Sequence, residues 1–294
     1  MCEHDDFDLM QKYAEAAQLS RRQFGAMGLG AGVASLVPGV SSAAEALPVM
    51  EMEVTIKTPD GVCDAYFVHP TKGKHPAVLV WPDIFGLRPA FRTMGKRLAE
   101  SGYAVLVVNP FYRLKKAPTS PEKANFQDPA TRELLMSQMG SLTATTNVTD
   151  AKAFVAWLDK QSPVDRKKKM GTTGYCMGGP ITMRTAAALP DRIGAGGSFH
   201  GGGLATDKPE SPHLLVPKMK AQYLIAIAEN DDKSDPKAKD LLREAFDAAK
   251  LPAEIEVYAG AMHGWCAIDS QVYNPPLAEK AWERMLELFK RALV

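Results

Sequence analysis

The sequence predicts an α/β fold with a mostly parallel central sheet and helices on both of its faces. Two continuous apolar runs, at residues 77–81 and 103–108, have the composition of strands buried on both faces. The helix-like segment 92–101 connects them, and a strand–helix–strand unit of this kind forms a right-handed crossover between parallel strands. A third observation, a glycine-framed junction between a short strand and a helix, specifies the fold further.

The chain before these strands is predicted to form a hairpin. Residues 50–57 and 62–68 alternate between apolar and polar side chains, as strands with one buried face do, and a Thr-Pro-Asp-Gly turn separates them. Residues 111–128 are rich in proline and lysine and are expected to form a loop. Helical periodicity then covers 131–139 and 146–158.

The second half of the chain continues the alternation of strands and helices. Neither an internal repeat nor a linker is apparent after residue 50, so we expect one domain over residues 47–294, without a large separate lid. Strands are expected at 169–173, 193–199, 221–228 and 253–258, and helices at 180–189, 237–250 and 277–293.

Composition and charge narrow the class of partner. The chain has 294 residues, of which 46% are hydrophobic and 23% charged, as in an ordinary globular protein with a sizeable core. The formal net charge is +1, so electrostatics favour neither nucleic acid nor an anionic membrane as a partner. A small-molecule substrate is the expected partner.

Residues 1–46 are expected to be a twin-arginine signal peptide. Ser20-Arg21-Arg22-Gln23-Phe24 has the twin-arginine pattern, and a glycine- and alanine-rich run follows from 25 to 40. This run is too short and too rich in glycine for a stable membrane span. Small-x-small sites end at Ala44 and at Ala46, and the sequence leaves the choice of cleavage site open. The leader predicts use of the twin-arginine export machinery and a periplasmic location.

The cysteines favour a thiol enzyme over a disulfide scaffold. After removal of the leader, Cys63, Cys176 and Cys266 remain, an odd number with no Cys-x-x-Cys pair and no Cys/His spacing that suits a metal. We therefore expect no metal site. A nucleophilic thiol in an oxidising compartment is open to oxidation, which favours a shielded pocket.

Cys176 is the candidate nucleophile. The segment Gly174-Tyr175-Cys176-Met177-Gly178 lies between a predicted strand and a predicted helix, which is the Gly-x-nucleophile-x-Gly arrangement of the α/β-hydrolase nucleophile elbow. Gly174 and Gly178 allow neighbouring backbone to approach without Cβ clashes, while the nucleophile takes a strained conformation. A thiol at a helix N-terminus also faces unpaired N–H groups, which favour negative charge.

His263 is the candidate base. It follows the strand 253–258, at an edge of the sheet where open α/β folds bind ligands. In α/β-hydrolases the chain order is nucleophile, acid, histidine. His200, which follows the strand 193–199, is a rival base, but it precedes the acidic loop and so has the wrong order. It is expected to line the pocket or to pack in a turn.

The acid that orients the histidine is expected in the loop 229–236, after the strand 221–228. Asp231 is the first choice, Asp232 the second and Asp235 the third, because Asp235 also suits the cap of the following helix. The alternative interpretation is that Asp231 is one of several acidic residues in an exposed turn and has no catalytic role.

An oxyanion hole needs two backbone donors. We expect one from the N–H of Met177, directly after the nucleophile, and the other from the N–H of Ile84, in the loop after the strand 77–81. The carboxylate of Asp83, beside Ile84, suits a hydrogen bond from the resting thiol. A turn or helix-cap aspartate is the alternative interpretation of Asp83.

Together these motifs resemble the dienelactone hydrolase family. The resemblance implies a single-domain α/β-hydrolase that needs no cofactor and hydrolyses esters and lactones such as carboxymethylenebutenolide. It also implies a triad of Cys176, Asp231 and His263, with oxyanion donors at Ile84 and Met177. The resemblance covers residues 50–294 and is carried by Trp81-Pro82-Asp83-Ile84-Phe85-Gly86, the elbow at 174–179, the Asp231 loop and Ala261-Met262-His263-Gly264.

Two departures from the family pattern concern the thiol and the substrate. Asp83 stands where the family usually has glutamate, a carboxylate that influences the thiol until substrate binds. Ala267 stands where the best-known members have an arginine that helps to hold the substrate carboxylate. The resemblance implies that Arg113 corresponds to the other substrate arginine of the family, and an exposed loop arginine is the alternative interpretation of Arg113. One guanidinium holds a substrate carboxylate more weakly than two do. Trp265, near the position of the missing arginine, suggests a more apolar pocket.

Two other functions remain alternatives at this point. One is a non-catalytic periplasmic binding protein that keeps the same fold. The other is a redox-sensing thiol protein in which Cys176 pairs with Cys266. The chain order of nucleophile, acid and histidine favours the hydrolase over both.

Overall fold

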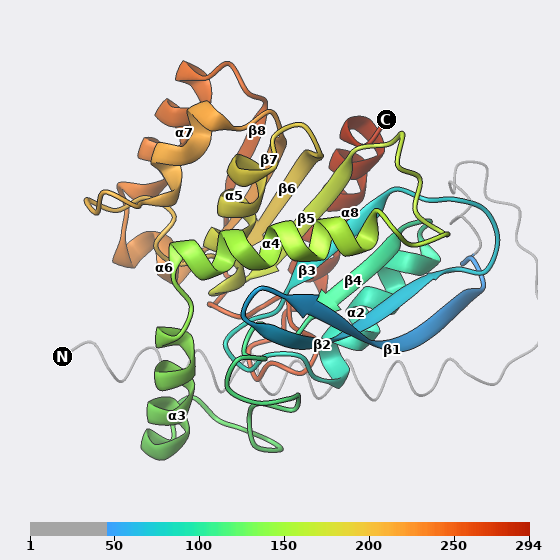
Figure 1. Ribbon diagram of the computed structural model, residues 1–294. Helices are drawn as coiled ribbons and strands as arrows, with labels where there is room; N and C mark the ends of the chain where they lie inside the picture. The colour runs from blue at the N-terminus through green and yellow to red at the C-terminus, as the bar shows by residue number, and fades with distance from the viewer. Residues whose placement is uncertain (1–45) are drawn as a thin grey trace, which may run out of the picture.

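Eight strands of the described chain form one sheet, in the order β1-β2-β4-β3-β5-β6-β7-β8 (Figure 1). The computed structural model describes residues 46–294. β1 (Val49–Thr58) and β2 (Gly61–Pro70) form the predicted hairpin, and β2 runs antiparallel to β4 (Ala104–Val108). From β4 to β8 across the sheet the strands are parallel, which confirms the mostly parallel α/β sheet.

The parallel strands coincide with the apolar runs of the sequence. β3 (Ala77–Trp81) is buried along its whole length, with Leu79 and Trp81 in the core on one face of the sheet and Val78 and Val80 in the core on the other. Alternate residues of a strand point to opposite faces, so a strand covered on both sides is apolar throughout. The remaining parallel strands are β5 (Met170–Tyr175), β6 (Ile193–Phe199), β7 (Gln222–Ala228) and β8 (Ala253–Tyr258).

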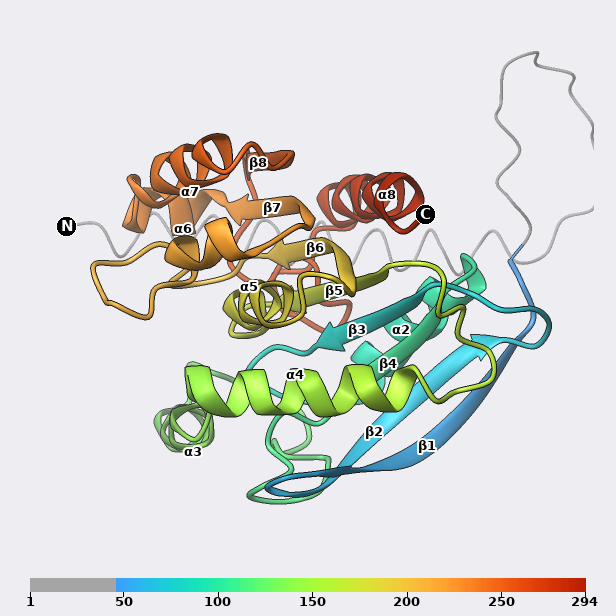
Figure 2. The ribbon, with the colours of Figure 1, turned by 45° about the horizontal axis from the view of Figure 1, so that its top comes forward.

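Helices cover both faces of the sheet (Figure 2). α4 (Ala144–Leu158), α5 (Gly178–Ala188) and α7 (Ala238–Ala248) lie on one face, and α2 (Pro89–Glu100) and α8 (Pro275–Ala292) lie on the other. Each of them buries apolar side chains against the strands. Within residues 46–294, no helix combines the length and the apolar character that a membrane crossing requires.

Caps determine where the helices begin. α2 starts at Pro89, earlier than the predicted start at residue 92, because proline is favoured in the first helical turn. At the start of α3 (Pro129–Gly140), the side chain of Asp128 accepts from the amide of Thr131 at 2.8 Å. Thr143 forms a capping box at the start of α4.

The sequence analysis does not predict two short helices. Residues 229–236, expected to be a loop, contain α6 (Glu229–Ser234), and a 3₁₀ helix covers Pro212–Lys218. α6 has no fully buried side chain, so it lacks the apolar periodicity that marks longer helices. It is held by tertiary contact, since the amide of Glu229 donates to the carbonyl of Ala261 at 2.9 Å.

The chain order reverses around β3. From β3 the chain passes to β4 on one side and then returns to β5 on the other side. Open α/β sheets bind ligands outside the carboxyl ends of the strands at such a switch point. The residues that follow β3 and β5 are the ones that the sequence assigns to the oxyanion hole and the nucleophile.

The junction between β5 and α5 is too tightly packed for a side chain at two positions. A Cβ atom at Gly174 would lie 2.2 Å from the carbonyl oxygen of Gly178, and one at Gly178 would lie 2.3 Å from the carbonyl oxygen of Trp81. These neighbours are backbone atoms in a close-packed core, so they cannot move aside as a flexible side chain can. The predicted need for glycine at both positions is confirmed.

Gly178→Ala is expected to lower the free energy of unfolding by about 1–3 kcal/mol, the usual effect of overpacking, because the new methyl group overlaps the Trp81 carbonyl. Equilibrium unfolding in urea, followed by circular dichroism, measures the change. Gly140→Ala is the matched control, since a Cβ atom there meets nothing within 4 Å. If both variants unfold at the urea concentration of the wild type, the close approach does not limit stability.

Candidate active site

Cys176 stands in the turn that follows β5. Its φ angle is +53°, in the left-handed region that few residues other than glycine adopt. Its amide donates to the carbonyl of Phe199, at the end of β6, at 3.0 Å, and its carbonyl accepts from the amide of Gly179 at 3.0 Å. Backbone hydrogen bonds thus hold the strained turn on both sides, and the side chain stays partly exposed.

His263 lies in the loop that follows β8. Its backbone amide donates to Oδ1 of Asn230 at 2.8 Å, and the amide of Gly260 in the same loop donates to the carboxylate of Glu229 at 2.5 Å. Both acceptors stand on α6, so these bonds hold the histidine loop against the helix that carries the predicted acid. The sequence analysis missed Glu229 and Asn230, although both directly precede Asp231, because it sought chemical groups and not residues that position a loop.

Asp231 is the carboxylate that reaches this histidine. Nδ1 of His263 donates to both of its oxygens, at 2.8 Å to Oδ2 and 3.0 Å to Oδ1. Asp232 instead binds Lys239 at 2.6 Å. Asp235 lies at the end of α6 and does not cap α7, so the expected cap is wrong. Of the three carboxylates considered, the structure brings the first choice to the histidine.

The other ring nitrogen of His263 faces the nucleophile. Because Asp231 occupies Nδ1, Nε2 is the ring nitrogen left to interact with the Cys176 side chain. Burial by itself lowers the pKa of His263, but the hydrogen bonds and charges of Asp231 and Cys176 outweigh burial and raise the pKa to about 10. The arrangement therefore favours a protonated His263 at neutral pH.

Ile84 and Met177 belong to a cluster of side chains against which the nucleophile packs. The same apolar cluster contains Phe111 and Leu135. Within residues 46–294, the amides of Ile84 and Met177 have no protein acceptor. Met177 is the N-cap of α5, where helix amides lack intrahelical partners. Both amides are therefore able to donate to a bound oxygen atom.

Comparison with known proteins identifies the family. A family model described as the dienelactone hydrolase family matches residues 63–293. The chain belongs to the dienelactone hydrolase family. This membership places it in the α/β-hydrolase superfamily and makes it a lactone or ester hydrolase. The resemblance inferred from the motifs is thereby confirmed.

Individual relatives agree with this assignment. A protein of Methylorubrum extorquens, provisionally named a carboxymethylenebutenolidase, is 29% identical over 295 residues, and the match covers 97% of each chain. The carboxymethylenebutenolidase of Rhodococcus opacus is 27% identical over 224 residues, which cover 75% of this chain and 83% of the relative. A solved structure from Klebsiella pneumoniae, provisionally described as a dienelactone hydrolase, shares the fold. Its TM-score is 0.71 at 24% identity, with 83% of this chain and 99% of that chain covered.

In this dienelactone hydrolase family member, Asp83 pairs with an arginine. Its two carboxylate oxygens accept from the guanidinium of Arg88 at 2.6 and 2.9 Å, and Oδ1 also accepts from the amide of Phe85. Arg88 in turn binds Asp269 at 2.7 Å. The structure thus gives Asp83 a salt bridge in place of the expected contact with the resting thiol, because Arg88 occupies both oxygens.

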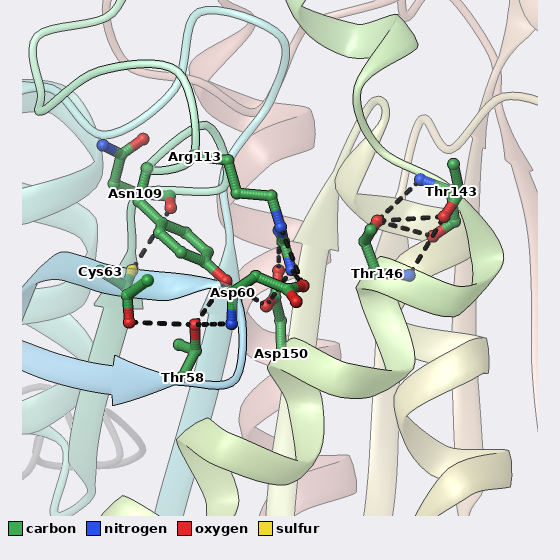
Figure 3. A network of polar contacts seen from close by, with 10 residues as sticks. Thr58, Asp60, Cys63, Asn109, Arg113, Thr143, Thr146 and Asp150 are labelled. Atoms are coloured by element: carbon green, nitrogen blue, oxygen red, sulfur yellow. Dashed lines mark hydrogen bonds and ion pairs between the residues drawn. The ribbon is translucent and has the colours of Figure 1, made fainter.

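Arg113 is held by two aspartates (Figure 3). Its guanidinium donates to both oxygens of Asp150 at 2.7 Å, and to Asp60 in the turn between β1 and β2 at 2.5 Å. Asp150 is 1% exposed and also accepts from Tyr112 at 2.7 Å. The prediction that Arg113 holds a substrate carboxylate does not fit this geometry. Two carboxylates already neutralise its charge, and moving it away would leave Asp150 buried and unpaired.

Trp265 and His200 form a buried layer behind His263. Trp265 is completely buried and so does not present its ring to a substrate, contrary to expectation. Its ring packs against those of His200 and Tyr258, each with centroids 5.3 Å apart. His200 lies edge-on against His263, with ring centroids 4.9 Å apart. Trp265 therefore supports His263 through His200.

The surroundings of His200 do not suit a base. Burial, together with the charge of His263, lowers the pKa of His200 well below its usual range, so its ring is neutral at neutral pH. Neither ring nitrogen has a hydrogen-bond partner among the described residues. The sequence analysis recognised its position at a strand end but missed its contact with His263, because sequence spacing does not show which strand-end loops meet.

Asp231→Asn is expected to lower the pKa of His263, because the hydrogen bond and charge of this carboxylate raise it. A histidine with a raised pKa stays protonated until the pH passes that pKa, so the variant loses its imidazolium at a lower pH than the wild type does. A pH titration of the His263 ring resonances by NMR measures the shift.

Asp232→Asn is the matched control for this titration. It removes the adjacent carboxylate, which binds Lys239 and not the histidine. The titration of His263 is expected to stay where it is in the wild type. Equal shifts in the two variants would contradict the pairing of Asp231 with His263.

Proposed function

We propose that Cys176, His263 and Asp231 form a catalytic triad that hydrolyses an ester or lactone through a thioester acyl-enzyme. The position of His263, hydrogen-bonded to Asp231 and interacting with the Cys176 side chain, carries this proposal. This chemistry needs a nucleophile, a base and a group that orients the base, all within hydrogen-bond reach. The name of the Rhodococcus opacus relative, a carboxymethylenebutenolidase, supports a lactone or ester as the substrate.

In the first half of the reaction, the Cys176 thiolate attacks the carbonyl carbon of the substrate. A C–S bond forms, and the amides of Ile84 and Met177 stabilise the negative charge that develops on the carbonyl oxygen. When the tetrahedral intermediate collapses, the C–O bond to the leaving alkoxide breaks and the His263 imidazolium donates its proton to that oxygen. In a lactone, the released alcohol stays attached to the acyl group.

In the second half, neutral His263 takes a proton from water as the water oxygen attacks the thioester carbon. The C–S bond then breaks and the thiolate leaves. The carboxylic acid product ionises in water, and the thiolate–imidazolium pair is restored. Asp231 holds the ring in one orientation through both halves.

The two alternative functions find less support. Redox pairing needs a reactive partner for Cys176, but Cys266 is buried, and burial raises the pKa of its thiol well above the usual range. A binding protein without turnover does not need a histidine held between a carboxylate and a thiol. We therefore favour the hydrolase mechanism.

Cys176→Ala is expected to slow the hydrolysis of p-nitrophenyl acetate by about 10³-fold or more, because the variant lacks the atom that becomes acylated. Release of p-nitrophenolate measures the rate, and mass spectrometry of the wild type during turnover detects an acetyl group on the peptide that contains Cys176. Cys63→Ala is the matched control, since Cys63 is a buried thiol in β2. Wild-type activity in Cys176→Ala would refute the triad.

We also propose that the chain is exported to the periplasm by the twin-arginine route. The support comes from sequence pattern, because residues 1–45, with the Arg21-Arg22 pair and the first cleavage site, lie outside the described residues. The proposal concerns where the enzyme acts and is independent of the triad.

Replacement of Arg21 and Arg22 by lysine is expected to leave the precursor in the cytoplasm, because the export machinery reads the arginine pair. Cell fractionation of a bacterial host measures the location. N-terminal sequencing of the periplasmic wild type distinguishes cleavage after Ala44 from cleavage after Ala46. Equal periplasmic amounts of the wild type and the double variant would contradict the route.

A further inference from the structure

Apolar side chains from four segments of the chain form one cluster, and Cys176 packs against it. The segments are the loop after β3, the loop after β4, α3 with the turn that follows it, and the elbow itself. We call this group the α3 cluster. Its members are Ile84, Phe85, Phe111, Leu135, Met139, Leu142 and Met177.

Three members of the α3 cluster keep part of their surface open. Phe85, Met139 and Leu142 are partly buried, as is Cys176, whereas Leu135 is fully buried. A group attached to the Cys176 sulfur is therefore expected to contact these three side chains. The fully buried members hold them in place, as close-packed interiors do.

Two of the arginines that lie near the α3 cluster along the chain, Arg88 and Arg113, are already paired, and a third, Arg132, is an exposed residue of α3. Arg88 lies over the ring of Phe85, 5.3 Å from its centroid, but its guanidinium binds two carboxylates. Arg113, shortly after Phe111, also binds two carboxylates. To bind Arg88 or Arg113, a substrate carboxylate would have to displace one of these partners and leave it without its cation, which is costly for a buried group.

α3 stands apart from the helices that cover the sheet (Figure 1). Its buried residues are Leu135 and Gln138, and Gln138 donates to the carbonyl of Thr119 at 3.0 Å. On another side of the same helix, Met136 is 45% exposed. Substitutions at the partly exposed positions of α3 can therefore alter the cluster without disturbing the sheet.

We infer that the α3 cluster binds the acyl group of the substrate, and that this group is apolar and uncharged. The inference rests on the proposed thioester mechanism, since the acyl group is then attached to the Cys176 sulfur. Each methylene buried against apolar side chains favours binding by about fourfold. A carboxylate in the same place loses its hydration without a cation to replace it. Esters and lactones of aliphatic acids fit the cluster, and those with a carboxylate on the acyl group do not.

p-Nitrophenyl esters test this preference, because the leaving group is the same in all of them. kcat/KM is expected to rise by about tenfold or more from the acetate to the hexanoate. The monoester of adipic acid has the six-carbon chain of the hexanoate with a carboxylate in place of the terminal methyl group. It is expected to react about tenfold more slowly than the hexanoate, or slower still. Equal values for acetate and hexanoate, or for hexanoate and adipate, would overturn the inference.

Met139→Arg places a cation in the α3 cluster. It is expected to reduce the ratio of kcat/KM for hexanoate over adipate by about tenfold, because the new guanidinium pairs with the adipate carboxylate. Met136→Arg adds the same charge at the exposed position of the same helix and is expected to leave the ratio unchanged. The ratio is measured within each variant, so it does not depend on how much of that variant folds. Equal changes in both variants would also overturn the inference.

Cys176→Ala separates failure of this inference from failure of the proposed function. If the variant hydrolyses the hexanoate as the wild type does, the thioester mechanism is wrong and the inference falls with it. If the variant is inactive while the wild type is indifferent to chain length and charge, the mechanism stands and the assignment of the α3 cluster is wrong.

Discussion

The close approach of Gly178 to the end of β3 is the contact on which the rest of the site depends. With no Cβ atom at this position, the first turn of α5 packs directly on the carbonyl of Trp81. The turn between β5 and α5 must then be sharp, and Cys176 takes a positive φ. The same contact brings the amide of Met177, at the start of α5, close to the loop after β3 that carries Ile84. One backbone contact thus sets the positions of the sulfur and of both amide donors.

Parallel pairing of β7 and β8 brings the acid and the histidine to the same edge of the sheet. The two strands end in register, with Ala228 opposite Tyr258, so the segments that follow them start side by side. α6 turns Asp231 toward the histidine loop, and hydrogen bonds from that loop to Glu229 and Asn230 hold the two segments together. The contact between the carboxylate and the imidazole of His263 therefore follows from strand register and needs no long side chain to span a gap.

His263 lies between the carboxylate of Asp231 and the Cys176 side chain. Arg88 and Arg113 are neutralised by their own carboxylates, and burial keeps His200 neutral. Buried charges are stable when they are paired, so Arg88 and Arg113 are not free to bind a further carboxylate. The proposed triad and the proposed preference for an uncharged acyl group both rest on this arrangement.

Local pattern in the sequence was sufficient for the strands, for the tight turn that carries Cys176, and for the place of His263 in the loop after β8. These features are visible in the sequence itself. A strand that is buried on both faces needs apolar residues along its length, and a close backbone approach needs glycine at the point of contact. The sequence could not choose among the neighbouring aspartates, since only the direction in which α6 turns each one separates Asp231 from the others. Only the tertiary structure shows that Arg113 binds Asp60 and Asp150 and is not free to bind a substrate. A long side chain pairs with whichever carboxylate lies within its reach, and the sequence does not give the distances between segments that are far apart in the chain.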